Sequence, residues 1–201
     1  MEFATATHQL NNLSINERSV ELLENKEMPD VIFEVDGVLF TAHRSVLSAR
    51  SPIFKAEFFG GRTERKIERI QIKDTKPAIF KAMLHFIYSN SLPDIISDED
   101  IPNVTQLQQL YKAADRYALD GLKMICEDKL IREISINSVI SSLALADEHN
   151  SCGLKQACLD YASKPENICQ LAVKLEYIQF MLSNPFLLKE LCDNARDKGY
   201  D

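Results

Sequence analysis

The sequence lacks a long hydrophobic segment. It has no run of about 18 or more apolar residues, so we expect no transmembrane helix. The N-terminus, MEFATATHQL, also lacks the apolar core of a signal peptide. The cysteines are odd in number and form no CxxC pair: Cys126, Cys152, Cys158, Cys169 and Cys192. Together these absences predict reduced thiols and a location in the nucleus, the cytoplasm or both.

The sequence also lacks the common nucleotide-binding and catalytic motifs. It has no GxxxxGK[ST] or GxGxxG loop to hold phosphate groups, and no GxSxG or HExxH motif. The only candidate metal cluster is His149, Cys152, Cys158 and Cys169, and structural zinc usually has closer cysteine spacing. We therefore expect no enzyme activity, no cofactor and no bound metal.

The charge has the wrong sign for a general nucleic-acid binder. The formal net charge is -7, whereas binding along a phosphate backbone needs a basic surface. The basic run over residues 62–69 is interrupted by two glutamates and is typical of a solvated loop. We therefore predict no direct contact with nucleic acid.

The stretch 30–59, DVIFEVDGVLFTAHRSVLSARSPIFKAEFF, is the most informative part of the chain. Two apolar runs, 31–35 and 38–41, flank Asp36-Gly37, a pair suited to the φ > 0 positions of a two-residue turn. This pattern predicts a β-hairpin. Within 31–35, apolar residues occur at odd and at even positions, which point to opposite faces of a strand. This predicts a first strand that is covered on both faces.

Two helices are predicted after the hairpin. The first spans 42–50, with three residues near one face: Ala42, Val46 and Ala49. Ser51 and Pro52 match the N-cap and first position of a second helix. That helix carries Phe54 and Phe58 four residues apart, on one side.

One more strand is predicted, at 68–72, and only helices follow it. The helix over 77–88 is apolar almost all round, which places it inside a domain. Pro165 and Pro185 each mark the start of a later helix, and we expect the first of these to include Leu175. The chain therefore divides near residue 132 into a mixed portion and an all-helical tail, which is an α+β fold class.

Several dispersed segments occur in the order found in one family. The stretch quoted above, FKAMLHFIYSNSLP and LYKAADRYALDGLKMICEDKL resemble the BTB/POZ domain of the MATH–BTB group, the speckle-type POZ-like proteins, in its plant branch. SLALADEHNSCGLKQACLDY is similar to the BACK-type helical extension of that group. The resemblance implies an N-terminal extension at 1–27, a BTB fold of helices around a small mixed sheet at 28–132, and a BACK-like helical extension at 133–201.

The resemblance also implies partners. Members of this group dimerise through their N-terminal portion and bind the third cullin paralogue, which connects a substrate to a RING-type ubiquitin ligase. Expected partners are thus a cullin scaffold, a second BTB chain in a homodimer or heterodimer, and an unidentified substrate. The implied cullin-binding residues are Phe58, Phe59, Arg62, Glu64 and Tyr88. The implied dimer residues are Ile15, Leu22, Leu23, Asp30 and Arg44.

Several of these residues could instead have a purely structural role. The helix that carries Leu22 and Leu23 has a weak apolar stripe that suits packing on its own domain as well as dimerisation. Asp30 and Arg44 fit a hydrogen-bonded pair that fixes the start of a helix. Phe58, Phe59 and Tyr88 also fit ordinary places in the core, and this interpretation is favoured for Phe58.

Two features depart from the group's pattern. Aligned without gaps, the hydrophobic-x-Glu motif that contacts cullin becomes Arg62-Thr63-Glu64. A cation in an apolar pocket costs a few kcal/mol unless its head stays in water. Only 29 residues precede Asp30, fewer than the ~50 of a small domain, so we expect no MATH domain in this chain.

The first hypothesis is a non-enzymatic adaptor of a cullin–RING ligase. The second is a BTB dimerisation module that regulates full-length MATH–BTB relatives without binding cullin. The third is a nuclear co-regulator that presents a peptide groove along the dimer seam, and an enzyme is the fourth.

Overall fold

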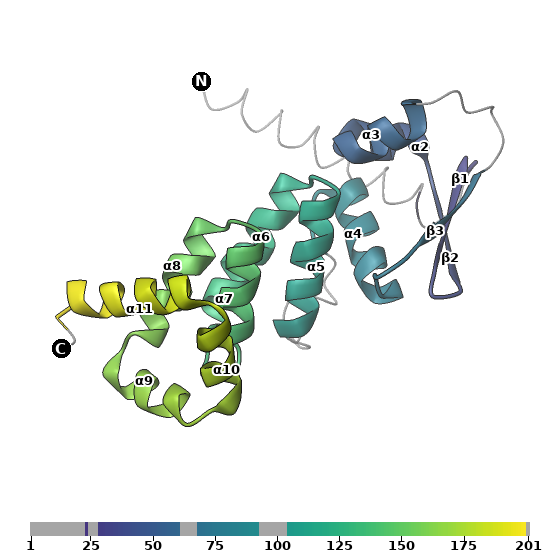
Figure 1. The fold of residues 1–201 in the computed structure, drawn as a ribbon. Helices are drawn as coiled ribbons and strands as arrows, with labels where there is room; N and C mark the ends of the chain where they lie inside the picture. The colour runs from purple at the N-terminus through teal and green to yellow at the C-terminus, as the bar shows by residue number, and fades with distance from the viewer. Residues whose placement is uncertain (1–22, 24–27, 61–67, 93–103, 200–201) are drawn as a thin grey trace, which may run out of the picture. The chain divides into compact units, whose positions relative to one another are not determined.

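The computed structural model describes residues 23, 28–60, 68–92 and 104–199 (Figure 1). The chain divides into two compact units, Met1–Lys123 and Met124–Asp201, and the boundary falls within helix α6, Asp120–Arg132. None of the described helices has the length and apolar character needed to cross a membrane. Within the described ranges, no three His, Cys, Asp or Glu side chains gather as metal ligands.

A three-stranded mixed sheet opens the first unit. Strand β1 is Val31–Val35, β2 is Val38–Ala42 and β3 is Glu68–Ile72, in the order β2-β1-β3. β1 pairs antiparallel with β2 and parallel with β3. Asp36 and Gly37 have φ angles of 47° and 77°, which confirms the predicted hairpin turn.

The central strand β1 buries one of its faces completely. Val31, Phe33 and Val35 are fully buried, whereas Ile32 and Glu34 on the opposite face are only half-buried. The predicted cover on both faces of β1 is thus complete on one face and only partial on the other.

Helix α4, Pro77–Ser89, supplies the cover on the buried face. The ring of Phe80 lies 5.2 Å from that of Phe33 and 5.3 Å from that of Phe40, measured between centroids. α4 lies between the sheet and helix α5, Val104–Arg116 (Figure 1). The all-round apolar sequence of α4 correctly predicted this position.

Two short helices connect the hairpin to the rest of the unit. Helix α2 is Arg44–Arg50 and helix α3 is Pro52–Phe59, so α2 begins two residues later than predicted. Ala42 is the last residue of β2, because it pairs with Val31 in the sheet. The expected apolar face of α2 was wrong: Leu47 is the buried residue, Val46 is half-buried and Ala49 is exposed.

The second unit is helical throughout its described part. Its further helices are α7 Val139–Glu148, α8 Cys152–Ala162, α9 Pro165–Ala172, α10 Leu175–Ser183 and α11 Pro185–Asp197. The helix that begins at Pro165 ends before Leu175, contrary to the prediction. Lys174 adopts an extended conformation there, and its Nζ donates to the Ile136 carbonyl at 3.2 Å and to Asn137 Oδ1 at 2.7 Å. The two units together confirm the α+β class.

Candidate protein-interaction surface

Ser51 fixes the position of helix α3. Its hydroxyl accepts a hydrogen bond from the backbone N–H of Phe54 at 3.2 Å, as expected of an N-cap. The same hydroxyl donates to the carbonyl of Tyr117 at 2.6 Å. Ser51 is 1% exposed, so this link from the start of α3 to the residue after α5 is shielded from water.

Aromatic stacking holds the inner side of α3. The ring of Phe54 stacks on that of Tyr117 at 4.5 Å and on that of Phe58 at 5.7 Å. The guanidinium of Arg44 lies 5.5 Å from the centre of the Phe58 ring. Phe58 is 4% exposed and belongs to the core. A cullin could reach it only after the helix had moved.

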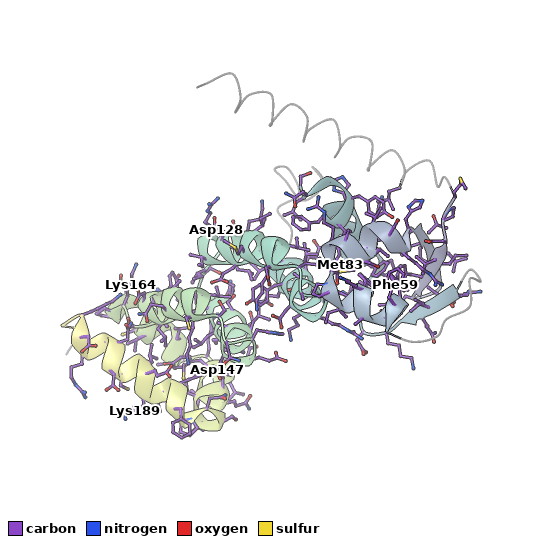
Figure 2. The ribbon with its side chains drawn as sticks, turned by 90° about the horizontal axis from the view of Figure 1, so that it is seen from above. Phe59, Met83, Asp128, Asp147, Lys164 and Lys189 are labelled. Carbon is purple, nitrogen blue, oxygen red and sulfur yellow. The ribbon has the colours of Figure 1, made fainter. Side chains whose placement is uncertain are left out.

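The outer side of α3 carries apolar side chains in water. Phe59 is 66% exposed and Ile53 is 44% exposed, with exposed Ala56 between them (Figure 2 labels Phe59). The three residues are spaced by three, so they lie along one side of the helix. We call Ile53, Ala56 and Phe59 the outer face of α3. Aromatic side chains such as that of Phe59 are enriched in protein interfaces.

Tyr88 lies inside the unit and contacts the start of α2. Its hydroxyl accepts a hydrogen bond from the backbone N–H of His43 at 2.9 Å and lies 2.9 Å from His43 Nδ1. Tyr88 is 1% exposed. Burial raises the pKa of the Tyr88 phenol to about 12, the hydrogen bond from His43 opposes this shift, and the charge of Asp30 adds to it.

The side chain of Asp30 contacts the backbone of Arg44. The carboxylate of Asp30 accepts a hydrogen bond from the N–H of Arg44 at 2.7 Å. Arg44 is the first residue of α2, and its N-cap, His43, makes no side-chain capping bond. Asp30 therefore satisfies one of the free N–H groups at the helix start. This geometry fits the structural interpretation of the pair.

Part of the predicted sites lies outside the described residues: Ile15, Leu22, Arg62 and Glu64. Leu23 is helical and half-buried, and it lines a groove with β2 and α4. Phe58 and Phe59 are adjacent on α3 but lie on its inner and outer sides, whereas Tyr88 is buried and bonds to His43. The cullin and dimer assignments of all these residues stay predictions. Sequence reasoning missed Ile53, although its spacing from Phe59 in PIFKAEFF was a usable signal.

Comparisons with known proteins agree on the family. The BTB/POZ domain model matches residues 20–134, and the BPM/SPOP BACK domain model matches residues 138–192. The Arabidopsis thaliana BTB/POZ and MATH domain-containing protein 3 is 37% identical over 89% of this chain and 45% of its own length. Protein 4 of the same series is 40% identical over 71% of this chain and 32% of its own length. The chain thus spans less than half the length of these relatives.

A solved structure supports the fold alone. The BTB domain of zebrafish PATZ1 matches 61% of this chain and 93% of that domain, with a TM-score of 0.50 and 19% identity. The family models match protein-interaction modules and no enzyme family. The chain belongs to the BTB/POZ family and carries a BACK domain of the BPM/SPOP type after its BTB domain, as in the MATH–BTB proteins.

Proposed function

We propose that this chain binds the N-terminal helical region of the third cullin paralogue through the outer face of α3 and serves as an adaptor of a RING-type ubiquitin ligase. The observation that carries the proposal is Phe59, an aromatic side chain 66% exposed on a helix whose start is tied to the core by Ser51 and Phe54. Domains of this family mediate dimerisation and cullin binding. A helix that is already formed before binding loses less conformational entropy when it binds, which favours affinity.

The proposed mechanism is proximity. The adaptor performs no bond chemistry, because it holds a substrate near a charged ubiquitin-conjugating enzyme and so raises the local concentration. A dimer presents two such positions, which strengthens capture of a substrate with two sites. We place this activity in the nucleus or the cytoplasm, and the five free thiols suit such a reducing compartment.

A second candidate is a dimerisation module that does not bind cullin. Arg62 favours it, because a cation stands where the group's cullin motif has an apolar residue. Replacing Arg62 by methionine separates the candidates. If this loop contacts cullin, Arg62→Met strengthens binding, since an apolar side chain enters the pocket without losing hydration. Unchanged affinity would remove the loop from the proposed contact.

The main test is titration calorimetry of the chain against the cullin N-terminal region. We expect a dissociation constant at or below about a micromolar, which corresponds to about -8 kcal/mol. Phe59→Ala is expected to weaken binding about tenfold or more, because it removes an exposed aromatic anchor. Met28→Ala is the matched control, since Met28 is 91% exposed in the same unit and is not part of the outer face of α3.

Two outcomes would count against the adaptor. Equal loss of affinity in Phe59→Ala and Met28→Ala would show that the outer face of α3 is not the contact. No heat and no complex on gel filtration, from a folded dimer, would favour the dimerisation module instead.

A further inference from the structure

A surface pocket lies beside one end of the sheet, with walls from helices α4 and α5. Its volume is about 440 Å³, inside the range of about 300–1,000 Å³ found for ligand pockets. β1 and β3 run parallel with Val35 paired to Ile72, so the connections that follow these two strands leave the sheet at the same end and reach the pocket. None of the described residues that line it belongs to α3. The pocket is therefore a different surface from the outer face of α3.

The pocket combines an apolar wall with a charged rim. Ile79 of α4 and Ala113 of α5 are 5% and 6% exposed and supply the wall. Three exposed cations surround it: Lys76, Lys112 and Arg116. Lys112 and Arg116 are four residues apart on α5, so they lie on one side of that helix. A ligand that fits this arrangement has an apolar stem and a charged head.

The pocket is positively charged, although the protein as a whole has a formal net charge of -7. Asp36 and Asp74 also line it, so three cations against two carboxylates leave a formal charge of +1. Among the described residues, neither Lys76 nor Arg116 forms an ion pair, and Arg116 donates only to the Lys73 carbonyl, at 3.5 Å. This balance suits a head with one negative charge, because the two carboxylates repel a phosphate dianion more strongly.

One polar group of the pocket lacks a hydrogen bond. The Oε1 atom of Gln109, on α5, is buried and has no hydrogen-bond partner within the described ranges. A buried acceptor without a donor is unfavourable. A backbone N–H of a bound peptide can supply that donor once the Gln109 side chain turns toward the pocket. A free carboxylate or phosphate ion has no such N–H to offer.

We propose that this pocket binds a glutamate side chain of a partner protein's acidic segment. The methylene groups of the glutamate pack on Ile79 and Ala113, as the stems of charged side chains commonly do. Its carboxylate meets the cations of Lys76 and Arg116 in charge-assisted hydrogen bonds. The adjacent peptide N–H pairs with Gln109. Because the cations are exposed, one glutamate alone binds weakly, with a dissociation constant of about a millimolar.

Backbone amide shifts measured by NMR on the full chain test the site with a defined probe. The probe is the peptide GSGEGSG, capped at both ends, and GSGQGSG with the same caps is its uncharged match. The first peptide is expected to shift the amides of Thr75, Lys76 and Ala113 in a saturable way, and the second to leave them unchanged. Equal shifts with both peptides, no saturable shift, or equal shifts at Lys55 outside the pocket would each overturn the proposal. Tighter binding of inorganic phosphate would overturn it as well.

A matched pair of lysines tests the same contact by substitution. Lys76 and Lys81 are both exposed at α4, but only Lys76 lines this pocket, and it makes no side-chain capping bond at the helix start. Lys76→Gln combined with Arg116→Gln is expected to weaken binding of the glutamate peptide at least tenfold, whereas Lys81→Gln leaves it unchanged. Wild-type affinity in the double variant, or an equal loss in Lys81→Gln, would contradict the proposal. If the double variant fails to fold, as judged by circular dichroism, the two peptides on the wild-type chain decide.

Discussion

The two units of this protein achieve order by different means. The core of the first unit is built on contacting aromatic rings, among them Phe33, Phe54, Phe80 and Tyr117. The core of the second unit has none of these ring contacts among its described residues. Its buried positions are mainly leucine, alanine and cysteine, such as Leu154. Aromatic rings bury a large area each and prefer particular mutual geometries, so ring contacts constrain the elements that carry them.

Polar contacts at the surface connect the helices of the second unit. Lys155 of α8 pairs with Asp147 of α7 at 3.0 Å and with Glu190 of α11 at 2.7 Å (Figure 2 labels Asp147). Asp160 of α8 pairs with Lys198 at 2.6 Å. Such exposed pairs contribute little stability each. The ring contacts of the first unit are therefore suited to holding α3 in one orientation. The second unit depends instead on many individually weaker contacts, both aliphatic packing and surface ion pairs.

Two cysteines of the second unit are buried and also belong to its core of small apolar side chains. Burial raises the pKa of Cys126 and of Cys158 to about 12, so both remain neutral and unreactive near neutral pH. They act as small apolar side chains in the core.

The largest predicted effect tests the aromatic core directly. Phe54→Ala removes a ring that contacts three others and is expected to lower the free energy of unfolding by about 3–5 kcal/mol. Leu154→Ala, at a fully buried position of the second unit, is expected to cost about 2–5 kcal/mol. Urea unfolding followed by circular dichroism measures both. A smaller cost for Phe54→Ala than for Leu154→Ala would contradict the comparison.

Tyr88→Phe gives the next effect. It removes the acceptor of the His43 N–H and is expected to cost about 1–3 kcal/mol. Because the folded-state pKa of about 12 exceeds the ordinary 10.0, the phenol's contribution is complete below pH 10 and is lost as the pH rises to about 12. Ultraviolet titration of tyrosine should lose its most alkaline phase in Tyr88→Phe. Persistence of that phase would assign it to another tyrosine.

Ser51→Ala tests the link between α3 and the end of α5. It removes the N-cap of α3 and the donor to the Tyr117 carbonyl, and is expected to cost about 1–2 kcal/mol. Ser51→Thr, which keeps the hydroxyl, is the control in the same thermal unfolding assay. Equal midpoints for all three proteins would mean that the hydroxyl does not hold α3.

The smallest effect is expected in the second unit. Lys155→Met removes two ion pairs and is expected to cost about 1 kcal/mol or less, because the partner carboxylates are nearly half exposed. Lys189→Met is the control, since Lys189 is exposed on α11 (Figure 2). The difference between the two midpoints should shrink in high salt. A salt-independent difference would mean that packing of the Lys155 stem, not its charge, is lost.

Local signals made much of the fold predictable. Asp36-Gly37 determined the hairpin, and Ser51-Pro52 determined the start of α3, because each depends only on neighbouring residues. The break after α9 was not predictable, since Lys174 is held by hydrogen bonds to residues far away in the sequence. The same is true of the contact between His43 and Tyr88.

The site was predictable only in outline. The spacing of four between Phe54 and Phe58 favoured a core position for Phe58, and the structure buries it, whereas Phe59 is 66% exposed. The sequence assigned both residues to the cullin contact and so did not separate an exposed anchor from a core residue. Arg62, Ile15 and Leu22 lie outside the described residues, and their roles stay predictions.

The most direct test of the central claim is hydrogen exchange of the chain, followed by mass spectrometry, with and without the cullin N-terminal region. The account predicts that peptides covering α3, with Ile53 and Phe59, become protected on addition of the cullin fragment. Protection that omits α3, in a sample where complex formation is confirmed, would contradict the claim that the outer face of α3 is the binding surface.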